Sequence, residues 1–162
     1  MINKYKVRPT TGKIIKSIFD ILQNYQLNGH KFIDLFCGTG RVGIEAYKKG
    51  FDVTAVEKNN RQFLKIKKLF LTKNFKIKLI KKDAVKFLKN LNESSDVFYL
   101  DPPYEKIELY EECLKIIFNN KLLADNGVII LEKNPRITLQ NDFGKYNAKN
   151  YVYGDTELVV IG

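Results

Sequence analysis

Short apolar runs alternate along this chain with segments that have the periodicity of amphipathic helices, and this alternation restricts the possible folds most strongly. Such alternation is typical of βαβ units in a parallel sheet. Gly154-Asp155 separates the last two runs and indicates an antiparallel hairpin there. We therefore predict an α/β fold: an open, mostly parallel sheet of about seven strands with a C-terminal antiparallel hairpin and helices on both faces. The expected strands are residues 31–36, 52–57, 76–80, 97–100, 128–131, 149–153 and 157–161.

The segments between these strands predict helices. The first should open near Pro9 to Thr11, because proline suits a first helical turn and threonine can cap it. Another should cover residues 60–72, and Asp83 should cap a short helix. The 162 residues contain no linker or repeat, so we expect a single domain, 1–162, in which residues 1–28 form a basic N-terminal segment and helix.

The composition excludes several classes of protein. A net charge of +10 suits a polyanionic partner such as nucleic acid, although a base-composition bias in the coding DNA would also favour the 24 lysines. Two cysteines and one histidine exclude a disulfide framework, a four-ligand zinc site and a multi-histidine site, so we expect no metal. No apolar run reaches the ~18–20 residues that span a bilayer, and no signal peptide is evident, so we expect a cytoplasmic protein without membrane contacts.

The strand at 31–36 leads into a turn of the form G-x-G-x-x-G, made by Gly38, Gly40 and Gly43. Glycine is needed in such a turn where φ is positive and where a ligand lies against the backbone. Glu57 ends the next strand, 19 positions after Gly38, where it can bond the ribose hydroxyls of a nucleoside. These features predict a nucleoside cofactor, and an ordinary glycine-rich turn beside a solvated glutamate is the alternative.

Asp34 discriminates between the possible cofactors. A dinucleotide would set its pyrophosphate at this turn, where a carboxylate is unfavourable, whereas S-adenosylmethionine carries a sulfonium and an ammonium that a carboxylate attracts. The charge of Asp34 therefore favours S-adenosylmethionine over NAD. Asp83, just after the strand at 76–80, can accept a hydrogen bond from the adenine amine, or it can serve only as a helix cap.

The turn Asp101-Pro102-Pro103-Tyr104 should lie at the same sheet edge as the glycine turn. Ionised Asp101 only accepts hydrogen bonds, the prolines cannot donate, and Tyr104 offers a ring for stacking. This combination suits a planar exocyclic amine. If Asp101 and the Pro102 carbonyl hold its two N–H groups, its lone pair turns toward an incoming methyl group. A proline pair that merely ends a strand is the alternative.

The cysteines and the histidine carry other interpretations. Cys37 or Cys113 could supply a nucleophile for carbon methylation of pyrimidines, but we expect both to be buried structural thiols. His30 precedes the first strand, on what should be the opposite edge of the sheet, and we assign it no role.

These motifs resemble those of a known enzyme class. Asp34–Gly40, Glu57, Asp83-Ala84 and Asp101-Pro102-Pro103-Tyr104 are similar to the motifs of class I S-adenosylmethionine-dependent methyltransferases that modify amino groups. With Arg8-Pro9-Thr10-Thr11 and Tyr153-Gly154-Asp155-Thr156, the chain resembles the RsmD-type family, which methylates guanine-N2 of 16S ribosomal RNA.

The chain departs from that family at two places. Seven residues precede Arg8, where the family usually carries a longer segment that forms a hairpin, and Ile15-Lys16 stand where it commonly has an Arg-Glu pair. The Asp-Pro-Pro-Tyr turn is shared with DNA adenine methylases, and it is the Arg-Pro-Thr-Thr segment that narrows the resemblance.

The resemblance implies a Rossmann-like class I methyltransferase fold, S-adenosylmethionine as the cofactor, and ribosomal RNA or a small-subunit assembly particle as the partner. We expect the protein to be a monomer. It implies that the cofactor is bound by Asp34, Phe36, Gly38, Gly40, Glu57, Asp83 and Ala84. It implies catalysis by Asp101, Pro102, Pro103 and Tyr104, and substrate binding by Arg8, Thr10 and Tyr104.

We therefore expect an enzyme that methylates an exocyclic base amine, guanine-N2 in 16S ribosomal RNA. The first alternative is a DNA adenine-N6 methyltransferase, although 162 residues leave little room for the recognition domain that sequence-reading enzymes usually add. The second is a non-catalytic RNA-binding or assembly factor that retains the cofactor pocket. The third is an NAD-dependent enzyme, which Asp34 disfavours.

Overall fold

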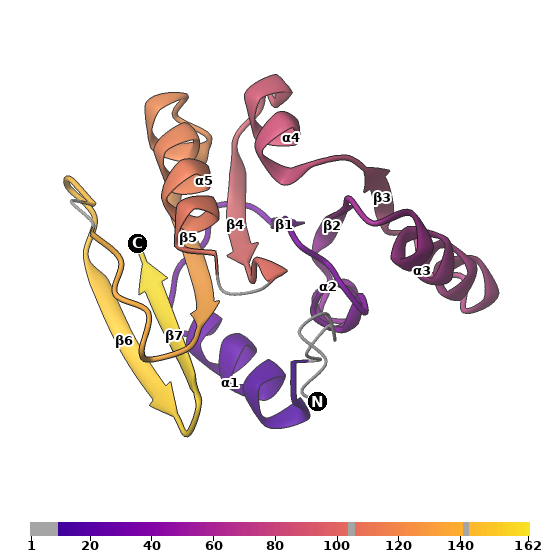
Figure 1. Cartoon of the computed structure of the whole chain (residues 1–162), viewed down its shortest axis with the longest axis horizontal. Helices are drawn as coiled ribbons and strands as arrows, with labels where there is room; N and C mark the ends of the chain where they lie inside the picture. The colour runs from indigo at the N-terminus through magenta and orange to yellow at the C-terminus, as the bar shows by residue number, and fades with distance from the viewer. Residues whose placement is uncertain (1–9, 104–105, 141–142) are drawn as a thin grey trace.

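The computed structural model describes residues 10–103, 106–140 and 143–162. Its centre is a seven-stranded sheet in the order β3-β2-β1-β4-β5-β7-β6 (Figure 1). Strands β1 to β5 pair in parallel, and β7 pairs antiparallel with both β5 and β6. The predicted sheet and its terminal hairpin are confirmed. The strands are β1 (Lys31–Asp34), β2 (Asp52–Glu57), β3 (Lys78–Lys81), β4 (Ser95–Leu100), β5 (Leu123–Lys133), β6 (Ala148–Tyr153) and β7 (Thr156–Ile161).

Helices cover both faces of the sheet, as predicted (Figure 1). Helices α1, α2 and α3 pack on one face, together with Phe32 and Val97, whereas α4 and α5 pack on the other, together with Ile33 and Phe98. Neighbouring residues of β1 and β4 reach opposite cores because side chains alternate along a strand. Within the described ranges, no helix is long and apolar enough to cross a membrane. The helices are α1 (Gly12–Leu22), α2 (Arg41–Lys48), α3 (Asn60–Thr72), α4 (Ala84–Asn90) and α5 (Ile107–Asn119).

Side-chain caps set the starts of three helices. The Thr11 hydroxyl accepts from the backbone N–H of Ile14 at the start of α1. Asn59 caps α3 in the same way, and Asp83 caps α4 as predicted. A cap of this kind stabilises a helix by about 0.5–2 kcal/mol because it satisfies a backbone donor that the helix leaves unpaired.

The strands differ from the prediction mainly at their ends. The prediction carried the first strand to Phe36, but β1 ends at Asp34 because the chain turns out of the sheet into the glycine loop. Strand β3 begins at Lys78, not at residue 76. Strand β5 is longer than the predicted 128–131 at both ends. It begins at Leu123, which pairs with Ser95 of β4 before an irregularity in the register, and it continues to Lys133, which pairs with Glu157 of β7.

A buried ion pair attaches the terminal hairpin to the parallel part of the sheet. Lys133 at the end of β5 lies 2.5 Å from Glu157 of β7, and both side chains are less than a tenth exposed. Lys133 also donates to the carbonyls of Asn134 and Ile137, while Asn150 of β6 donates to the second oxygen of Glu157. Because these hydrogen bonds compensate both buried charges, the end of β5 is held firmly beside the hairpin.

Candidate active site

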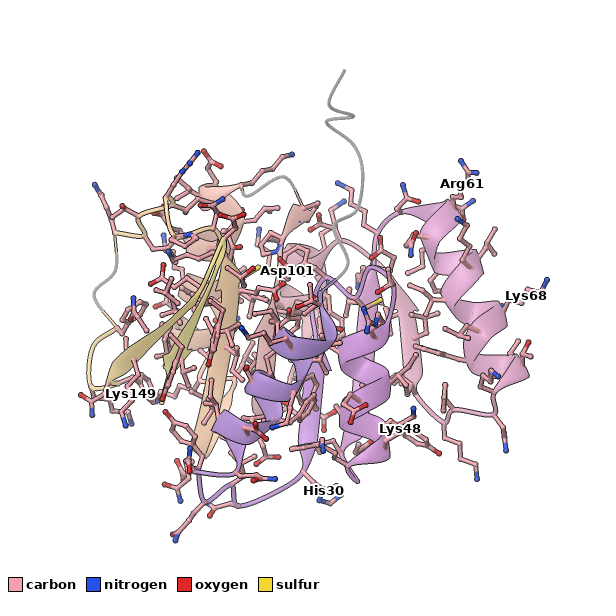
Figure 2. All side chains as sticks on the ribbon, turned by 90° about the horizontal axis from the view of Figure 1, so that it is seen from below. His30, Lys48, Arg61, Lys68, Asp101 and Lys149 are labelled. Atoms are coloured by element: carbon pink, nitrogen blue, oxygen red, sulfur yellow. The ribbon has the colours of Figure 1, made fainter. Side chains whose placement is uncertain are left out.

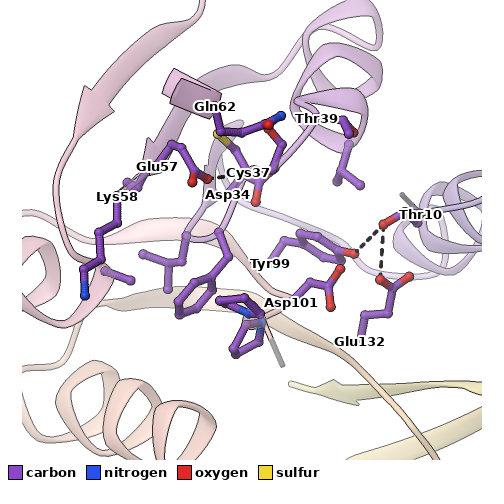
Figure 3. Close-up of a pocket in the computed structure, with 18 of the residues that line it drawn as sticks. Thr10, Asp34, Cys37, Thr39, Glu57, Lys58, Gln62, Tyr99, Asp101 and Glu132 are labelled. Carbon is purple, nitrogen blue, oxygen red and sulfur yellow. Dashed lines mark hydrogen bonds between the residues drawn. The ribbon is translucent and has the colours of Figure 1, made fainter. Parts of the chain in front are cut away.

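A cavity of about 1220 Å³ opens where the parallel strands end (Figure 3). Parallel pairing brings the carboxyl ends of the strands to one edge, the place where open α/β sheets bind ligands. Arg8 and Tyr104 lie outside the described residues. The predicted site residues that line the cavity are Thr10, Asp34, Phe36, Gly38, Glu57, Asp83, Ala84, Asp101, Pro102 and Pro103.

Among the predicted cofactor residues that the structure describes, Gly40 alone stands back from the cavity wall. It precedes α2 with a φ of 80°, and a Cβ there would lie 3.4 Å from the ring of Phe70. Gly38 also has a positive φ, and it does line the cavity. The two glycines therefore allow the turn for the same conformational reason, but of the two only Gly38 lines the cavity.

Asp34 ends β1 as a nearly inaccessible carboxyl group, with 1% of its surface exposed. Its Oδ1 has no hydrogen-bond partner among the described residues. Burial raises the pKa of Asp34 from 3.8 to about 8, and the negative charges of Glu57 and Glu132 act in the same direction, against a backbone hydrogen bond from Phe36. An unpaired buried oxygen costs about 1–3 kcal/mol. The wall of the cavity at Asp34 is therefore suited to a ligand that donates hydrogen bonds or carries positive charge.

Glu57 joins the end of β2 to the glycine turn. Its Oε2 accepts from the backbone N–H of Gly38 at 3.1 Å, and its Oε1 accepts from that of Asn59 at 3.1 Å. Gln62 of α3 adds a hydrogen bond to the Gly38 carbonyl at 2.7 Å. Burial raises the pKa of Glu57, while the two backbone donors oppose that shift. Since each carboxylate oxygen has a second lone pair, Glu57 can still accept from ligand hydroxyl groups.

Asp83 has its capping role confirmed, and its role as a ligand acceptor stays a prediction. Its Oδ1 accepts from the backbone N–H of Lys86 at 3.1 Å. Its Oδ2 lies 3.7 Å from Lys58 Nζ, an ion pair between partly exposed groups that contributes little to stability.

The Asp-Pro-Pro turn closes the cavity beyond β4. Asp101 is half-buried, Pro102 is buried and Pro103 is exposed. The Tyr99 hydroxyl, two residues before this turn, faces the same space (Figure 3). Burial raises the pKa of Tyr99 well above its ordinary value, and the negative charges of Asp101 and Glu132 add to the effect. The Tyr99 hydroxyl therefore stays protonated and available as a donor.

Tyr99 and Glu132 are two of the polar wall residues that the sequence interpretation missed. Tyr99 was assigned only to an apolar strand, and Glu132 falls one residue beyond the predicted end of its strand. The available signal was that each is a polar group at the carboxyl end of a central strand, the same rule that found Asp34 and Glu57.

The cysteines and the histidine lie where they were expected. Cys37 and Cys113 are both buried free thiols. Burial raises the pKa of both thiols, that of Cys113 to about 12, so neither is a thiolate at neutral pH. His30 lies at the far end of the sheet from Asp101 (Figure 2). Among the described residues, no group of three or more His, Cys, Asp or Glu side chains could hold a metal ion.

Comparison with known proteins points to methyltransferases. A family described as "Conserved hypothetical protein 95" matches residues 1–162. The chain is 31% identical over 167 residues to "Putative rRNA methyltransferase YlbH" of Bacillus subtilis, covering 94% of this chain and 86% of that protein. It is 28% identical over 135 residues to "Ribosomal RNA small subunit methyltransferase D" of Buchnera aphidicola, covering 82% of this chain and 68% of that protein.

A solved structure shares the fold. "Putative methyltransferase yhhF from Escherichia coli" superposes with a TM-score of 0.85 over 97% of this chain and 88% of that chain, at 21% identity. The fold is thus that of Rossmann-like methyltransferases.

The buried carboxyl of Asp34 leads to a prediction about stability. Its pKa is about 8 in the folded state and 3.8 ordinarily, so between these values the folded state binds more protons than the unfolded state. Stability should therefore fall as the pH rises from about 4 through about 8. Asp34→Asn should remove this dependence and raise the free energy of unfolding near pH 8 by about 1–3 kcal/mol.

Urea unfolding of the ligand-free protein at several pH values from about 6 to about 9 measures the effect. Asp20→Asn, at an exposed aspartate of α1, is the matched control and should leave the pH dependence unchanged. An Asp34→Asn variant with the pH dependence of the wild type would contradict the buried, protonated carboxyl.

Proposed function

We infer the activity of this chain from its family: it belongs to the family described as "Conserved hypothetical protein 95", and it is a methyltransferase that acts on ribosomal RNA. We propose that the methyl donor is S-adenosylmethionine and that the acceptor is an exocyclic base amine, guanine-N2 in the small-subunit RNA. The observation that carries the proposal is that the carboxyl group of Asp34, with one unpaired oxygen, and the Asp101-Pro102-Pro103 turn line one cavity.

The cavity residues fit the proposed donor. S-adenosylmethionine supplies a methyl group on a positively charged sulfonium. Asp34 would face the cationic part of this molecule, because its unpaired oxygen needs a donor or a positive charge. Glu57 would accept from the ribose hydroxyls through its remaining lone pairs, and Asp83 from the adenine amine. A bound pyrophosphate would instead meet Glu57 as a like charge and would offer Asp34 neither a donor nor a positive charge, which disfavours NAD.

Asp101 and the Pro102 carbonyl would hold the target amine. Both are acceptors on the rim of the cavity, and the rigid φ of proline limits the freedom of the turn. Two accepted N–H bonds would rotate the amine so that its nitrogen lone pair points into the cavity. Asp101 would also stabilise the positive charge that develops on this nitrogen as the methyl group is transferred. Positioning and electrostatics would then account for the rate, without a covalent intermediate on the protein.

The base must leave its stack to reach this turn, because an amine inside a duplex cannot approach the cavity. Tyr104 would stack on the displaced base, as predicted from its ring.

Two measurements test the proposal. Calorimetry should detect binding of S-adenosylmethionine and not of NAD, and binding of NAD alone would overturn the cofactor assignment. Mass spectrometry of ribosomal RNA from cells that lack the protein should reveal one missing methylated guanosine. That modification should return with the wild-type gene and not with an Asp101→Ala gene. An unchanged set of modified nucleosides would overturn the assigned substrate.

Asp101→Ala should lower kcat by about 10²–10³ while leaving the affinity for S-adenosylmethionine nearly unchanged. The reason is that the proposed contact strengthens as charge develops on the nitrogen, so its loss affects the transition state more than the bound state. Methyl transfer to small-subunit RNA measures kcat, with Asp20→Ala on α1 as a control that also removes one carboxylate. Wild-type turnover by Asp101→Ala would show that this turn is not the catalytic site.

The rim of the cavity carries basic residues that should contact RNA phosphates. Arg61 and Lys65 of α3 are exposed and line the cavity. Lys48 and Lys149 are exposed and do not line it (Figure 2). A double variant, Arg61→Gln with Lys65→Gln, should weaken RNA binding and flatten its salt dependence. The slope of log K against log salt should drop by about 0.7–0.9 for each lost phosphate contact.

Lys48→Gln with Lys149→Gln provides the matched control, since it removes the same net charge away from the cavity. Filter binding of a small-subunit RNA fragment at several salt concentrations compares the two. If both double variants lose RNA affinity equally, the loss is an effect of net charge, and a specific role of the basic residues on the rim is refuted.

A further inference from the structure

Thr10, Tyr99 and Glu132 form a hydrogen-bonded group on the cavity wall, near Asp101 (Figure 3). The Thr10 hydroxyl donates to Glu132 Oε2 at 3.1 Å and lies 3.4 Å from the Tyr99 hydroxyl. The guanidinium of Arg41 donates to the Thr10 carbonyl at 2.8 Å, which ties this group to α2. The carboxylate of Glu132 is therefore held in place before any ligand arrives.

Glu132 is a nearly buried acidic residue on the cavity wall. It is only 8% exposed, and within the described chain Thr10 donates to Oε2 while no hydrogen bond reaches Oε1. The neighbouring Lys133 does not offset its charge, because Lys133 Nζ bonds Glu157 and two carbonyl groups instead. Among the described residues no cation pairs with this carboxylate, so its place on the cavity wall suits a ligand group that donates to it.

The purine bases differ in what they would present to such a carboxylate. A flipped base is read along its Watson–Crick edge. On guanine, the N2 amine and the adjacent N1–H are both donors. On adenine, the N6 amine lies beside N1, which has a lone pair and no hydrogen. A carboxylate next to the amine-binding turn therefore attracts the guanine edge and repels the adenine edge.

We propose that Glu132 is the specificity-determining residue of this site, and that it accepts the N1–H of the guanine whose N2 amine is held by Asp101 and the Pro102 carbonyl. The inference rests on the proposed function and adds the group that selects the base. It also explains why the site would exclude adenine, although the Asp-Pro-Pro-Tyr turn is shared with enzymes that methylate adenine.

Base analogues in the target position test this assignment. The probe is a synthetic stem-loop RNA that carries, at the nucleotide found by mapping, either guanosine or 2-aminopurine riboside. Both bases have the N2 amine, but N1 of 2-aminopurine has a lone pair in place of the hydrogen. Wild-type protein should prefer guanosine by at least about 100-fold in kcat/KM, since a site built around a donor rejects the analogue that lacks it.

Glu132→Gln should reduce this preference to within about 10-fold. The glutamine amide can still accept from Thr10 through its oxygen, and its NH₂ group can donate to the N1 lone pair of 2-aminopurine. Activity on guanosine should fall while activity on 2-aminopurine rises. A merely structural role would instead lower activity on both bases in proportion.

Glu157→Gln is the matched control, because it makes the same change at an equally buried carboxylate that does not line the cavity. This variant should lose stability, since Lys133 loses its ionic partner, but the ratio between the two bases should stay at the wild-type value. A ratio of rates is independent of the fraction of folded protein, so the comparison holds even if both variants are destabilised.

The outcomes separate the inference from the function on which it rests. If wild-type protein methylates no RNA, the proposed function fails. If it methylates guanosine but Glu132→Gln keeps the wild-type preference, or loses activity on both bases equally, the proposed function stands and the role of Glu132 is overturned. A narrowed preference in Glu132→Gln alone supports the inference.

Discussion

Parallel pairing of β1 between β2 and β4 is the constraint on which the rest of this structure depends. It forces β1, β2 and β4 to end at the same edge, so that Asp34, Glu57 and Asp101 meet although they are far apart in sequence. The same pairing buries Asp34 at the centre of the sheet, where neighbouring strands exclude water from its carboxyl. The fold thus creates an electrostatic cost at this edge, and a donating or cationic ligand can offset that cost.

The antiparallel hairpin completes this edge from the other side. Strand β7 pairs with β5 as far as Lys133, and the Lys133–Glu157 ion pair stabilises the end of this pairing. Because Lys133 pairs with Glu157, it makes no ion pair with the adjacent Glu132, whose carboxyl group lies on the cavity wall and accepts from Thr10. Thr10 then connects Glu132 to the segment before α1. The packing of the hairpin and the chemistry of the cavity are therefore linked through two adjacent residues of one strand.

The parts of the fold that local pattern determines could be predicted from the sequence. Strand β2 and helix α3 have the predicted bounds. The pattern of apolar and polar residues determines β2, and the Asn59 cap determines where α3 begins. Strand β5 could not be bounded, because its last residues are ordered by pairing with β7, a tertiary contact. Glu132 was missed for that reason.

The candidate site shows the same division between local and tertiary information. Residue types at strand ends predicted that Asp34 and Glu57 would line a ligand site, and both line the cavity. The state of Asp34 could not be predicted, because its orphaned oxygen results from burial by strands distant in the sequence. Similarly, Gly40 belongs to the motif but packs against Phe70, a contact that spacing alone does not reveal.

The distribution of charge gives the last constraint on what can enter the cavity. The chain has a net charge of +10, and basic residues such as Arg61 and Lys65 line the cavity. The carboxyl groups of Glu57, Asp101 and Glu132 line it as well, at the ends of the strands. The exposed basic residues attract the phosphates of a polyanion, while the carboxylates at the strand ends repel them. Those carboxyl groups favour a neutral group rich in donors, such as a base edge, or a cation beside them. In the proposed complex these two kinds of ligand meet, so one pattern of charge would keep the RNA backbone at the rim and admit the base and the sulfonium to the same cavity.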